Sequence, residues 1–110
     1  MIKLTSLVWK RPELTDAEFR DRWLDEHVEY AKRLVGLREY VIDFVTQGTA
    51  ESPSGVATLR FDSRDALDAA FADESLKGDL LRTRDQFARA VQVMLVDEEI
   101  IVPRMRSGRR

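Results

Sequence analysis

The sequence contains no cysteine and a single histidine, and these two scarcities exclude much of enzyme chemistry. Without cysteine, the chain can form no disulfide, thiolate nucleophile, thiolate-ligated zinc site or iron–sulfur cluster. One histidine cannot form a histidine metal cluster. We therefore expect no metal site.

Long apolar runs and an excess of one charge are also missing. No run approaches the ~20 apolar residues that a membrane span needs, and the first ten residues are too interrupted for a signal peptide. The formal net charge is -2, with 18 Lys+Arg and 20 Asp+Glu, which gives no general attraction for nucleic acid or anionic membranes. We expect a cytoplasmic protein with no nucleic-acid or membrane partner.

The residues that are present suffice for one small globular domain. The chain has 110 residues and 44% hydrophobic content, and we expect a single domain over 1–103. The segment 104–110 is rich in arginine. We interpret it as a basic, disordered C-terminal tail rather than a phosphate-binding element.

The first third of the chain predicts a strand followed by a helix. Ile2–Trp9 is rich in β-branched and bulky residues, as is typical of a strand. Thr15 and Glu18 have the spacing of a capping box, which predicts a helix over 15–34. Gly36 follows as a left-handed stop.

The remainder predicts three more strands and a broken helical segment. The alternation of Tyr40, Ile42 and Phe44 marks a core-facing side of a strand. Asp62 or Ser63 caps a helix, and we expect a break near Gly78 before a second helical piece. The three strands are expected over 37–46, 56–61 and 90–102.

This order of elements is that of a ferredoxin-like α+β sandwich, βαββαβ. A four-stranded antiparallel sheet would carry its helices on one face. The other face needs a cover, which back-to-back pairing of two sheets in a homodimer would provide. We expect that open face to carry some of Val41, Val45, Val56, Val91 and Val93.

The histidine, His27, falls within the apolar arc of the first predicted helix, together with Phe19 and Trp23. It is either a core histidine bonded to a backbone carbonyl or second-strand side chain, or a general acid/base facing a ligand cavity. Tyr40 is its natural companion, because its phenol can donate to an oxyanion or a substrate carbonyl. Taken alone, Tyr40 also fits an aromatic core position.

Several segments together carry a family resemblance: Ile2-Lys3-Leu4, Trp9-Lys10-Arg11-Pro12, Leu14-Thr15, Phe19, Trp23, His27, Gly36-Leu37, Tyr40, Gly55-Val56-Ala57, Phe61-Asp62-Ser63 and Glu98-Glu99. With them the sequence resembles the EthD family, named after a protein of ethyl tert-butyl ether degradation. The resemblance implies a dimeric α+β barrel. Relatives with this fold include polyketide dehydratases and cyclases, methylmuconolactone isomerases and haem-degrading monooxygenases.

In the isomerase-like relatives, the positions of His27 and Tyr40 are pocket residues that transfer a proton and polarise the substrate. Such isomerases can use a second pocket histidine, which this chain lacks. Asp85 is one carboxylate that would replace it, and Asp62 and Glu98 are others, although a cap or salt bridge also explains each of them.

The resemblance and the residues favour a cofactor-free enzyme, an isomerase, dehydratase or cyclase acting by proton transfer on an aromatic, lactone or polyketide-like small molecule. His27 and Tyr40 are its predicted catalytic residues. One alternative is a haem-binding or oxygen-using monooxygenase-like protein with His27 as the haem ligand. Another is a non-catalytic small-molecule-binding accessory protein. The predicted substrate-binding residues are Trp9, Phe19, Trp23, Phe44, Phe61 and Asp85.

Overall fold

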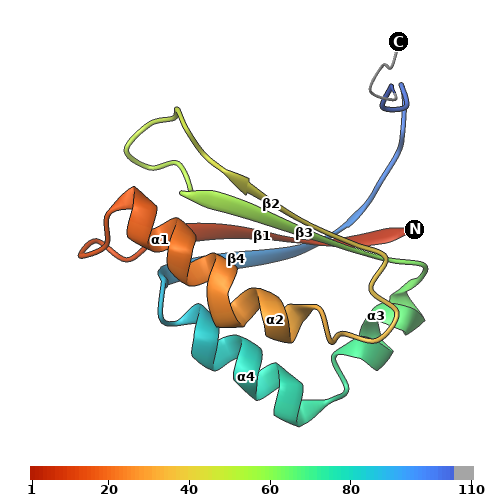
Figure 1. Ribbon diagram of the computed structural model, residues 1–110. Coiled ribbons are helices and arrows are strands. Elements are labelled where there is room, and N and C mark those ends of the chain that lie inside the picture. Colours follow the sequence, from red (N-terminus) through yellow and green to blue (C-terminus); the bar gives the residue numbers. More distant parts are fainter. Residues whose placement is uncertain (106–110) are drawn as a thin grey trace.

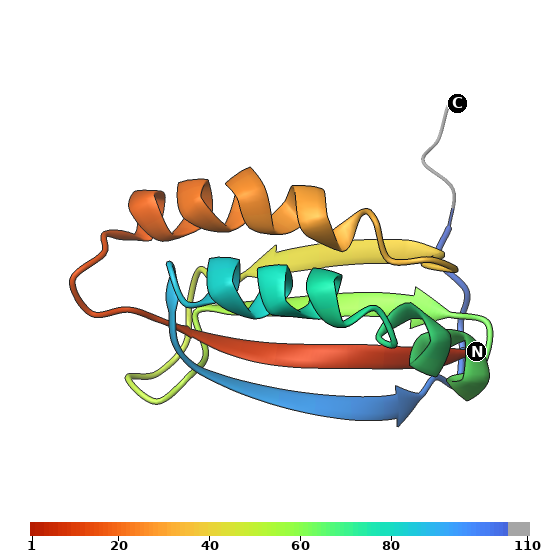
Figure 2. The ribbon, with the colours of Figure 1, turned by 90° about the horizontal axis from the view of Figure 1, so that it is seen from below.

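A computed structural model describes residues 1–105 of the chain. Four antiparallel strands form one sheet in the order β2-β3-β1-β4, with all helices on one face (Figures 1 and 2). The predicted ferredoxin-like α+β architecture is therefore confirmed. The strands are β1 (Ile2–Lys10), β2 (Glu39–Phe44), β3 (Gly55–Phe61) and β4 (Ala88–Asp97). The helical elements are α1 (Asp16–Arg22), η1 (Trp23–His27), α2 (Val28–Ala31), α3 (Arg64–Ala70) and α4 (Glu74–Arg84).

The first helix begins with the predicted capping box. The Glu18 backbone N–H donates to Thr15 Oγ1 at 3.1 Å, and the Thr15 N–H donates to Glu18 Oε1 at 2.8 Å. Gly36 adopts a φ of 78°, the left-handed conformation expected of it. The regular helix ends earlier than predicted, at Ala31.

A π-helical turn interrupts this helix, which the sequence pattern did not predict. Element η1 has five residues and joins α1 to α2, with a non-helical ψ of -117° at Asp25. Such turns insert an extra residue into a helix and are frequent at functional sites. Trp23 and His27 stand at the two ends of this turn.

Two predicted boundaries in the second half are wrong. The helical break lies before Asp73, whose side chain accepts a hydrogen bond from the Leu76 N–H and caps α4, so that Gly78 lies inside this helix. The last strand ends at Asp97 rather than at 102. Asp97 pairs with Ile2, the first residue of β1, so β4 has no partner beyond this point.

The sheet register decides which of the five valines lie on the open face, and Val41 and Val56 are among them. Val91 and Val93 pair with Val8 and Ser6 of β1 and share their helix-facing side, so neither belongs to the open face. Val56 lies on the opposite side of β3 from the buried residues of that strand, as predicted. The open face is formed mainly by Lys3, Thr5, Leu7, Trp9, Val41, Val56, Thr58, Arg60, Met94 and Val96.

The core fills the space between the helices and the sheet. Trp23, Phe61 and Phe87 are its largest fully buried apolar side chains. In Figure 2, the long helical segments lie over β2 and β3, while β4 extends beyond them at the sheet edge. Val93 on β4 is accordingly 52% exposed although it faces the helical side.

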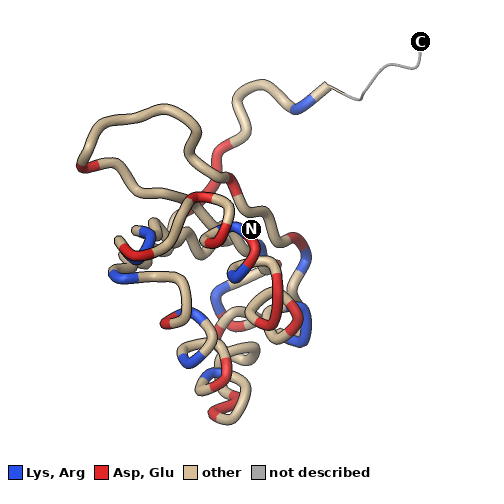
Figure 3. The backbone as a smooth tube through the Cα atoms, turned by 60° about the vertical axis from the view of Figure 1, so that its left-hand side comes forward, with Lys and Arg blue, Asp and Glu red and all other residues tan. Residues whose placement is uncertain are grey.

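Figure 3 shows acidic and basic positions interspersed along the backbone of the helices and loops. Many form surface ion pairs, such as Arg38 with Asp62 and Arg64 with Asp68. None of the described helices is long and apolar enough to cross a membrane. The predicted tail over 104–110 lies largely outside the described residues.

Candidate active site

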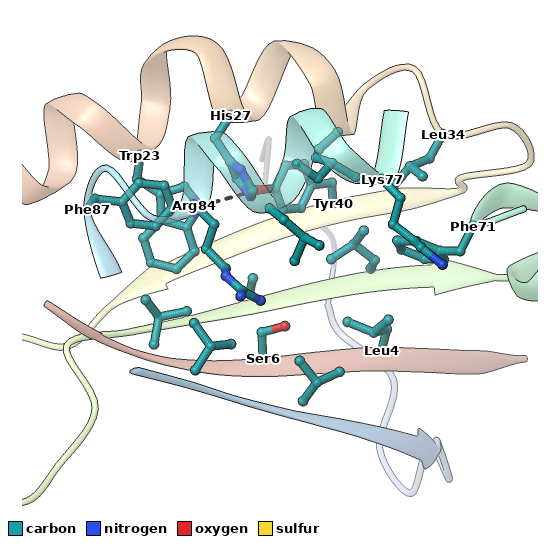
Figure 4. A pocket seen from close by; sticks show the side chains of 18 residues that line it. Leu4, Ser6, Trp23, His27, Leu34, Tyr40, Phe71, Lys77, Arg84 and Phe87 are labelled. Atoms are coloured by element: carbon teal, nitrogen blue, oxygen red, sulfur yellow. Dashed lines mark hydrogen bonds between the residues drawn. The ribbon is translucent and has the colours of Figure 1, made fainter. Parts of the chain in front are cut away.

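A cavity of about 390 Å³ lies between the helices and the sheet. This volume is within the range typical of small-molecule sites. Leu81 on α4 and Val93 on β4 both line it and are 46% and 52% exposed, which places its opening between this helix and the uncovered sheet edge. The lining is mostly aliphatic and aromatic, with five polar or charged side chains: Ser6, His27, Tyr40, Lys77 and Arg84 (Figure 4).

His27 is held by a hydroxyl of the neighbouring helix. His27 Nδ1 lies 2.8 Å from Thr83 Oγ1, and the Thr83 hydroxyl is 2.8 Å from the backbone oxygen of Asp79. Because the single Thr83 proton is donated to this carbonyl, Thr83 accepts from His27, and the neutral ring carries its proton on Nδ1. Nε2 is therefore the nitrogen with the free electron pair.

The imidazole is neutral at physiological pH. Burial lowers the pKa of His27 from its ordinary 6.5 to about 4, and the positive charge of Arg84 acts in the same direction. The nearby carbonyl of Leu80 opposes this shift with a smaller effect. A neutral ring with an unprotonated Nε2 can accept a proton from a bound molecule, or it can bind a metal ion through Nε2.

Tyr40 reaches the same cavity from β2. Its Oη accepts a hydrogen bond of 3.3 Å from the Trp23 indole, drawn as the dashed line in Figure 4. Burial raises the pKa of the Tyr40 phenol, and the bond from Trp23 has a smaller opposite effect. The phenol thus keeps its proton at neutral pH, and that proton remains available to a ligand oxygen.

Aromatic rings form one wall of the cavity. Trp23 and Phe87 stack with centroids 5.1 Å apart and planes inclined by 16°, and the edge of the His27 ring meets Phe87 at 5.3 Å. Gly55 permits this packing, since a Cβ at that position would lie 2.5 Å from Trp23 Cζ3. Because Trp23 and Phe87 are only 1% and 0% exposed, these rings back the cavity rather than present an open stacking surface.

Two cationic side chains also line the cavity, both from α4. Lys77 and Arg84 stand seven residues apart, about two helical turns, and so project from similar sides of the helix. Figure 4 shows the Arg84 guanidinium extending from α4 towards the sheet near Ser6. No acidic residue lines the cavity within the described part of the chain.

Trp23, His27 and Tyr40 are the predicted site residues that the fold brings together. Phe19 and Phe44 lie next to Trp23 in the aromatic cluster but line a separate hollow beneath the β2–β3 loop.

The other three predicted residues lie outside the cavity. Phe61 is fully buried in the core beside Phe71. Trp9 is on the open face of the sheet, where its indole donates to the Glu51 carbonyl. Asp85 follows the last residue of α4, and its side chain is 73% exposed.

The remaining carboxylate candidates form ion pairs away from the cavity. Asp62 accepts from Arg38 at 2.7 Å. Glu98 pairs with Arg60 and Lys3. Across residues 1–105, no three His, Cys, Asp or Glu side chains are grouped as metal ligands.

Several residues of the site were not predicted from the sequence, among them Thr83, Arg84 and Phe87. Thr83 recurs at helical spacing with Leu80 and Phe87, and a hydroxyl among apolar core positions is a signal for a buried partner. Arg84 carried no comparable signal, because a lone arginine near a helix end normally reaches solvent.

The comparisons with known proteins agree with this architecture. The profile of the EthD domain matches residues 11–90. No curated protein sequence matches the chain.

Three solved structures illustrate the shared fold. An EthD family protein from Bacillus halodurans is 19% identical with a TM-score of 0.71, the match covering 90% of this chain and 99% of that one. A dimeric ferredoxin-like protein of unknown function from Bacteroides fragilis is 9% identical (TM-score 0.65, 88% and 95% covered). SnoaB, a cofactor-independent oxygenase from Streptomyces nogalater, is 16% identical (TM-score 0.65, 94% and 97% covered).

Proposed function

The chain belongs to the EthD domain family, and on that premise we propose that it is a cofactor-free enzyme that moves a proton on a small carbonyl compound. The observation that carries this proposal is the buried, neutral His27, held by Thr83 in an apolar cavity that Tyr40 also lines. This arrangement supplies a base, a hydrogen-bond donor and a shielded space. An isomerisation, dehydration or cyclisation of an aromatic, lactone or polyketide-like compound needs these three elements.

His27 acts as the base in this proposal. Its unprotonated Nε2 takes a proton from a carbon next to the substrate carbonyl, and the electron pair of that C–H bond forms an enolate. The Nδ1–H bond to Thr83 keeps the ring in the required orientation while the positive charge develops. Return of the proton to another atom completes an isomerisation.

Tyr40 stabilises the enolate oxygen. The Trp23 indole already donates to Tyr40 Oη, so the phenol directs its own proton to the substrate. Hydrogen bonds to a developing oxyanion are strengthened where water is excluded. The apolar lining of the cavity surrounds the uncharged part of the substrate.

A second candidate is an oxygen-using reaction at the same site. It is favoured by the similarity to the structure of SnoaB, which is described as a cofactor-independent oxygenase. The first step would be the same deprotonation by His27, and molecular oxygen would then accept electrons from the carbanion. Haem ligation by His27 and binding without catalysis stay predictions that the experiments below distinguish.

We also propose that the protein is a homodimer that pairs through the open face of its sheet. Leu7, Val41, Val56 and Met94 give this face a partly apolar surface. The residues after β4 extend away from the body (Figure 1), and Ile101 is 83% exposed. A second copy would cover both features. A dimer of this kind acting on a small molecule fits a cytoplasmic location.

Solvent-deuterium exchange tests the proton transfer. The protein is incubated in D2O with lactones, phenolic acids and short polyketide mimics, and exchange next to the carbonyl is followed by NMR. His27→Ala should slow the exchange by roughly 10²- to 10⁴-fold, and Tyr40→Phe should also slow it. Tyr30→Phe is the matched control, because Tyr30 lies outside the cavity. Full exchange in His27→Ala would contradict the proposal.

Three further measurements separate the alternatives. Oxygen uptake that depends on His27 would favour the oxygenase candidate over an isomerase. A Soret band on addition of haemin that disappears in His27→Ala would favour haem binding. Saturable binding without exchange or oxygen uptake would favour a binding protein.

A further inference from the structure

The Arg84 side chain lines the cavity, is 33% exposed overall, and makes only a long ionic contact, with Asp85. Its Nε is fully buried and has no hydrogen-bond partner among the described residues. The carboxylate of Asp85 is 4.0 Å away from it, beyond hydrogen-bond distance, and is mostly exposed to water. A buried N–H of a charged group is unfavourable without a hydrogen-bond partner, which a ligand entering the cavity or a water molecule would supply.

Other arginines of the chain differ from Arg84 in this respect. Arg38 forms a forked pair with both carboxylate oxygens of Asp62, and Arg60 lies between Glu39 and Glu98. The Arg38–Asp62 pair is exposed, and the Arg60–Glu98 pair is partly exposed. Arg84 instead turns away from the surface charges and into the cavity, where the lining offers no carboxylate.

The cavity as a whole is therefore apolar with a positive end. Lys77 adds a second cation, although its ammonium also lies 3.4 Å from Glu74. A planar carboxylate matches the fork of a guanidinium, and a low-polarity surrounding strengthens that pair. The apolar remainder of the lining suits the uncharged part of the same molecule.

We propose that the ligand of this cavity is a carboxylic acid anion with a compact aromatic or cyclic body, and that Arg84 binds its carboxylate. This inference rests on the proposed function for the site but names a property that the proton transfer alone does not require. Arg84 is a substrate-binding residue in this scheme. His27 and Arg84 line the same cavity (Figure 4), so one molecule can contact both side chains.

Binding of matched acids and amides tests the proposal. The probes are phenylacetate and naphthalene-1-acetate, each with its neutral primary amide, titrated to millimolar concentration against the full chain. The single histidine gives one imidazole NMR signal that reports occupancy of the cavity. The wild-type protein should bind each acid about tenfold or more tightly than its amide, as expected for charge-assisted bonds.

Three variants assign that preference to one side chain. Arg84→Gln should remove the preference for the acid, and Arg84→Lys should retain part of it, because the charge remains but the fork is lost. Arg82→Gln makes the same change two residues earlier on the same helix, at a side chain that contacts Asp79 and Tyr30, and should retain the full preference. Circular dichroism verifies that each variant is folded.

The possible outcomes separate this inference from the proposed function. Equal affinity for acids and amides, or no binding of either acid by the wild-type protein, would overturn it, as would an acid preference that survives in Arg84→Gln. Arg84-dependent binding of the acids without any His27-dependent exchange would support the carboxylate site and contradict the proton transfer. His27-dependent exchange together with equal affinity for acids and amides would do the reverse.

Discussion

Thr83 and His27 are joined by a hydrogen bond of 2.8 Å although they lie 56 residues apart in the sequence. Thr83 is almost fully buried, at 1% exposure, and His27 ends the π-helical turn. The contact of α4 with this turn therefore sets both the orientation and the tautomer of the His27 ring. Packing between the two helices and chemistry in the cavity are coupled through this pair.

Replacing Thr83 with valine should impair both stability and proton transfer. Valine has a similar shape but no acceptor, so the Nδ1–H of His27 loses its partner in a buried place. The free energy of unfolding should fall by about 1–3 kcal/mol. Long-range ¹H–¹⁵N NMR spectra of the imidazole should also show a mixture of tautomers, and the exchange rate should drop.

Thr83→Ser is the control for this change. Serine keeps the hydroxyl that accepts from His27 and that donates to the Asp79 carbonyl. It should keep the Nδ1–H tautomer even if the lost methyl group lowers stability. The positioning role would be refuted by a valine variant with an unchanged tautomer and unchanged exchange rate.

Stability should fall as the pH is lowered from about 6.5 towards 4. In the unfolded chain His27 takes up a proton near pH 6.5, whereas in the folded protein burial keeps the pKa at about 4. Protons therefore bind the unfolded state first and favour it. A shift of this size corresponds to a loss of about 3 kcal/mol, complete near pH 4.

Urea unfolding of the wild type and His27→Gln across this range measures the effect. The hydrogen bond with Arg60 is the main reason that the pKa of Glu98 lies below its ordinary value of 4.5. The stability that Glu98 contributes is therefore lost only below about pH 4.5. The interval from about pH 6.5 to 5 thus isolates the histidine. Parallel stability curves for the two proteins over this interval would show that the pKa of His27 is not lowered by folding.

The parts of the fold that were predicted correctly are those set by residues close together in the sequence. The capping box of Thr15 and Glu18 and the left-handed Gly36 are set by the backbone within a few residues. The predicted break near Gly78 was wrong, because a glycine is tolerated inside a helix and the start of α4 is fixed by Asp73. The end of β4 depends on where β1 begins, which no local pattern of β4 contains.

The site was predictable only in part for a related reason. Helical spacing placed His27 with Trp23, and strand alternation placed Tyr40 on the helical side of the sheet. Thr83 and Arg84 depend on how α4 is rotated against the first helix, and the π-helical turn changes that relation. The pairing register of β1 places Trp9 on the open face of the sheet. An apolar pattern alone cannot assign a residue to one face of a sheet.

A charge on the open face of the sheet should dissociate the proposed homodimer. Leu7 lies on a central strand between Val56 and Gln92, so Leu7→Asp would bury a carboxylate at the interface between two sheets. Light scattering coupled to size exclusion should show a dimer for the wild type and a monomer for this variant. Ala69→Asp, at an exposed position of α3, should remain dimeric. A monomeric wild type would contradict the assembly.

Two glycine-to-alanine changes should have opposite effects on stability. At Gly78, an added Cβ meets no atom within 4 Å, and the residue lies in the interior of α4. Alanine loses less backbone entropy in a helix, so Gly78→Ala should raise the free energy of unfolding by about 0.5–1 kcal/mol.

At Gly55 the same change meets the Trp23 ring, with Cβ placed 2.5 Å from Cζ3. The ring stacks on Phe87 and donates to Tyr40, so it cannot move away without disturbing the cavity. Gly55→Ala should lower the free energy of unfolding by about 1–3 kcal/mol through overpacking. It should also weaken ligand binding, whereas Gly78→Ala leaves binding unchanged. Urea unfolding measures the effect on stability, and the imidazole titration measures the effect on binding. If Gly55→Ala were as stable as the wild type and bound ligands equally well, Trp23 would be free to move in the wall of the cavity.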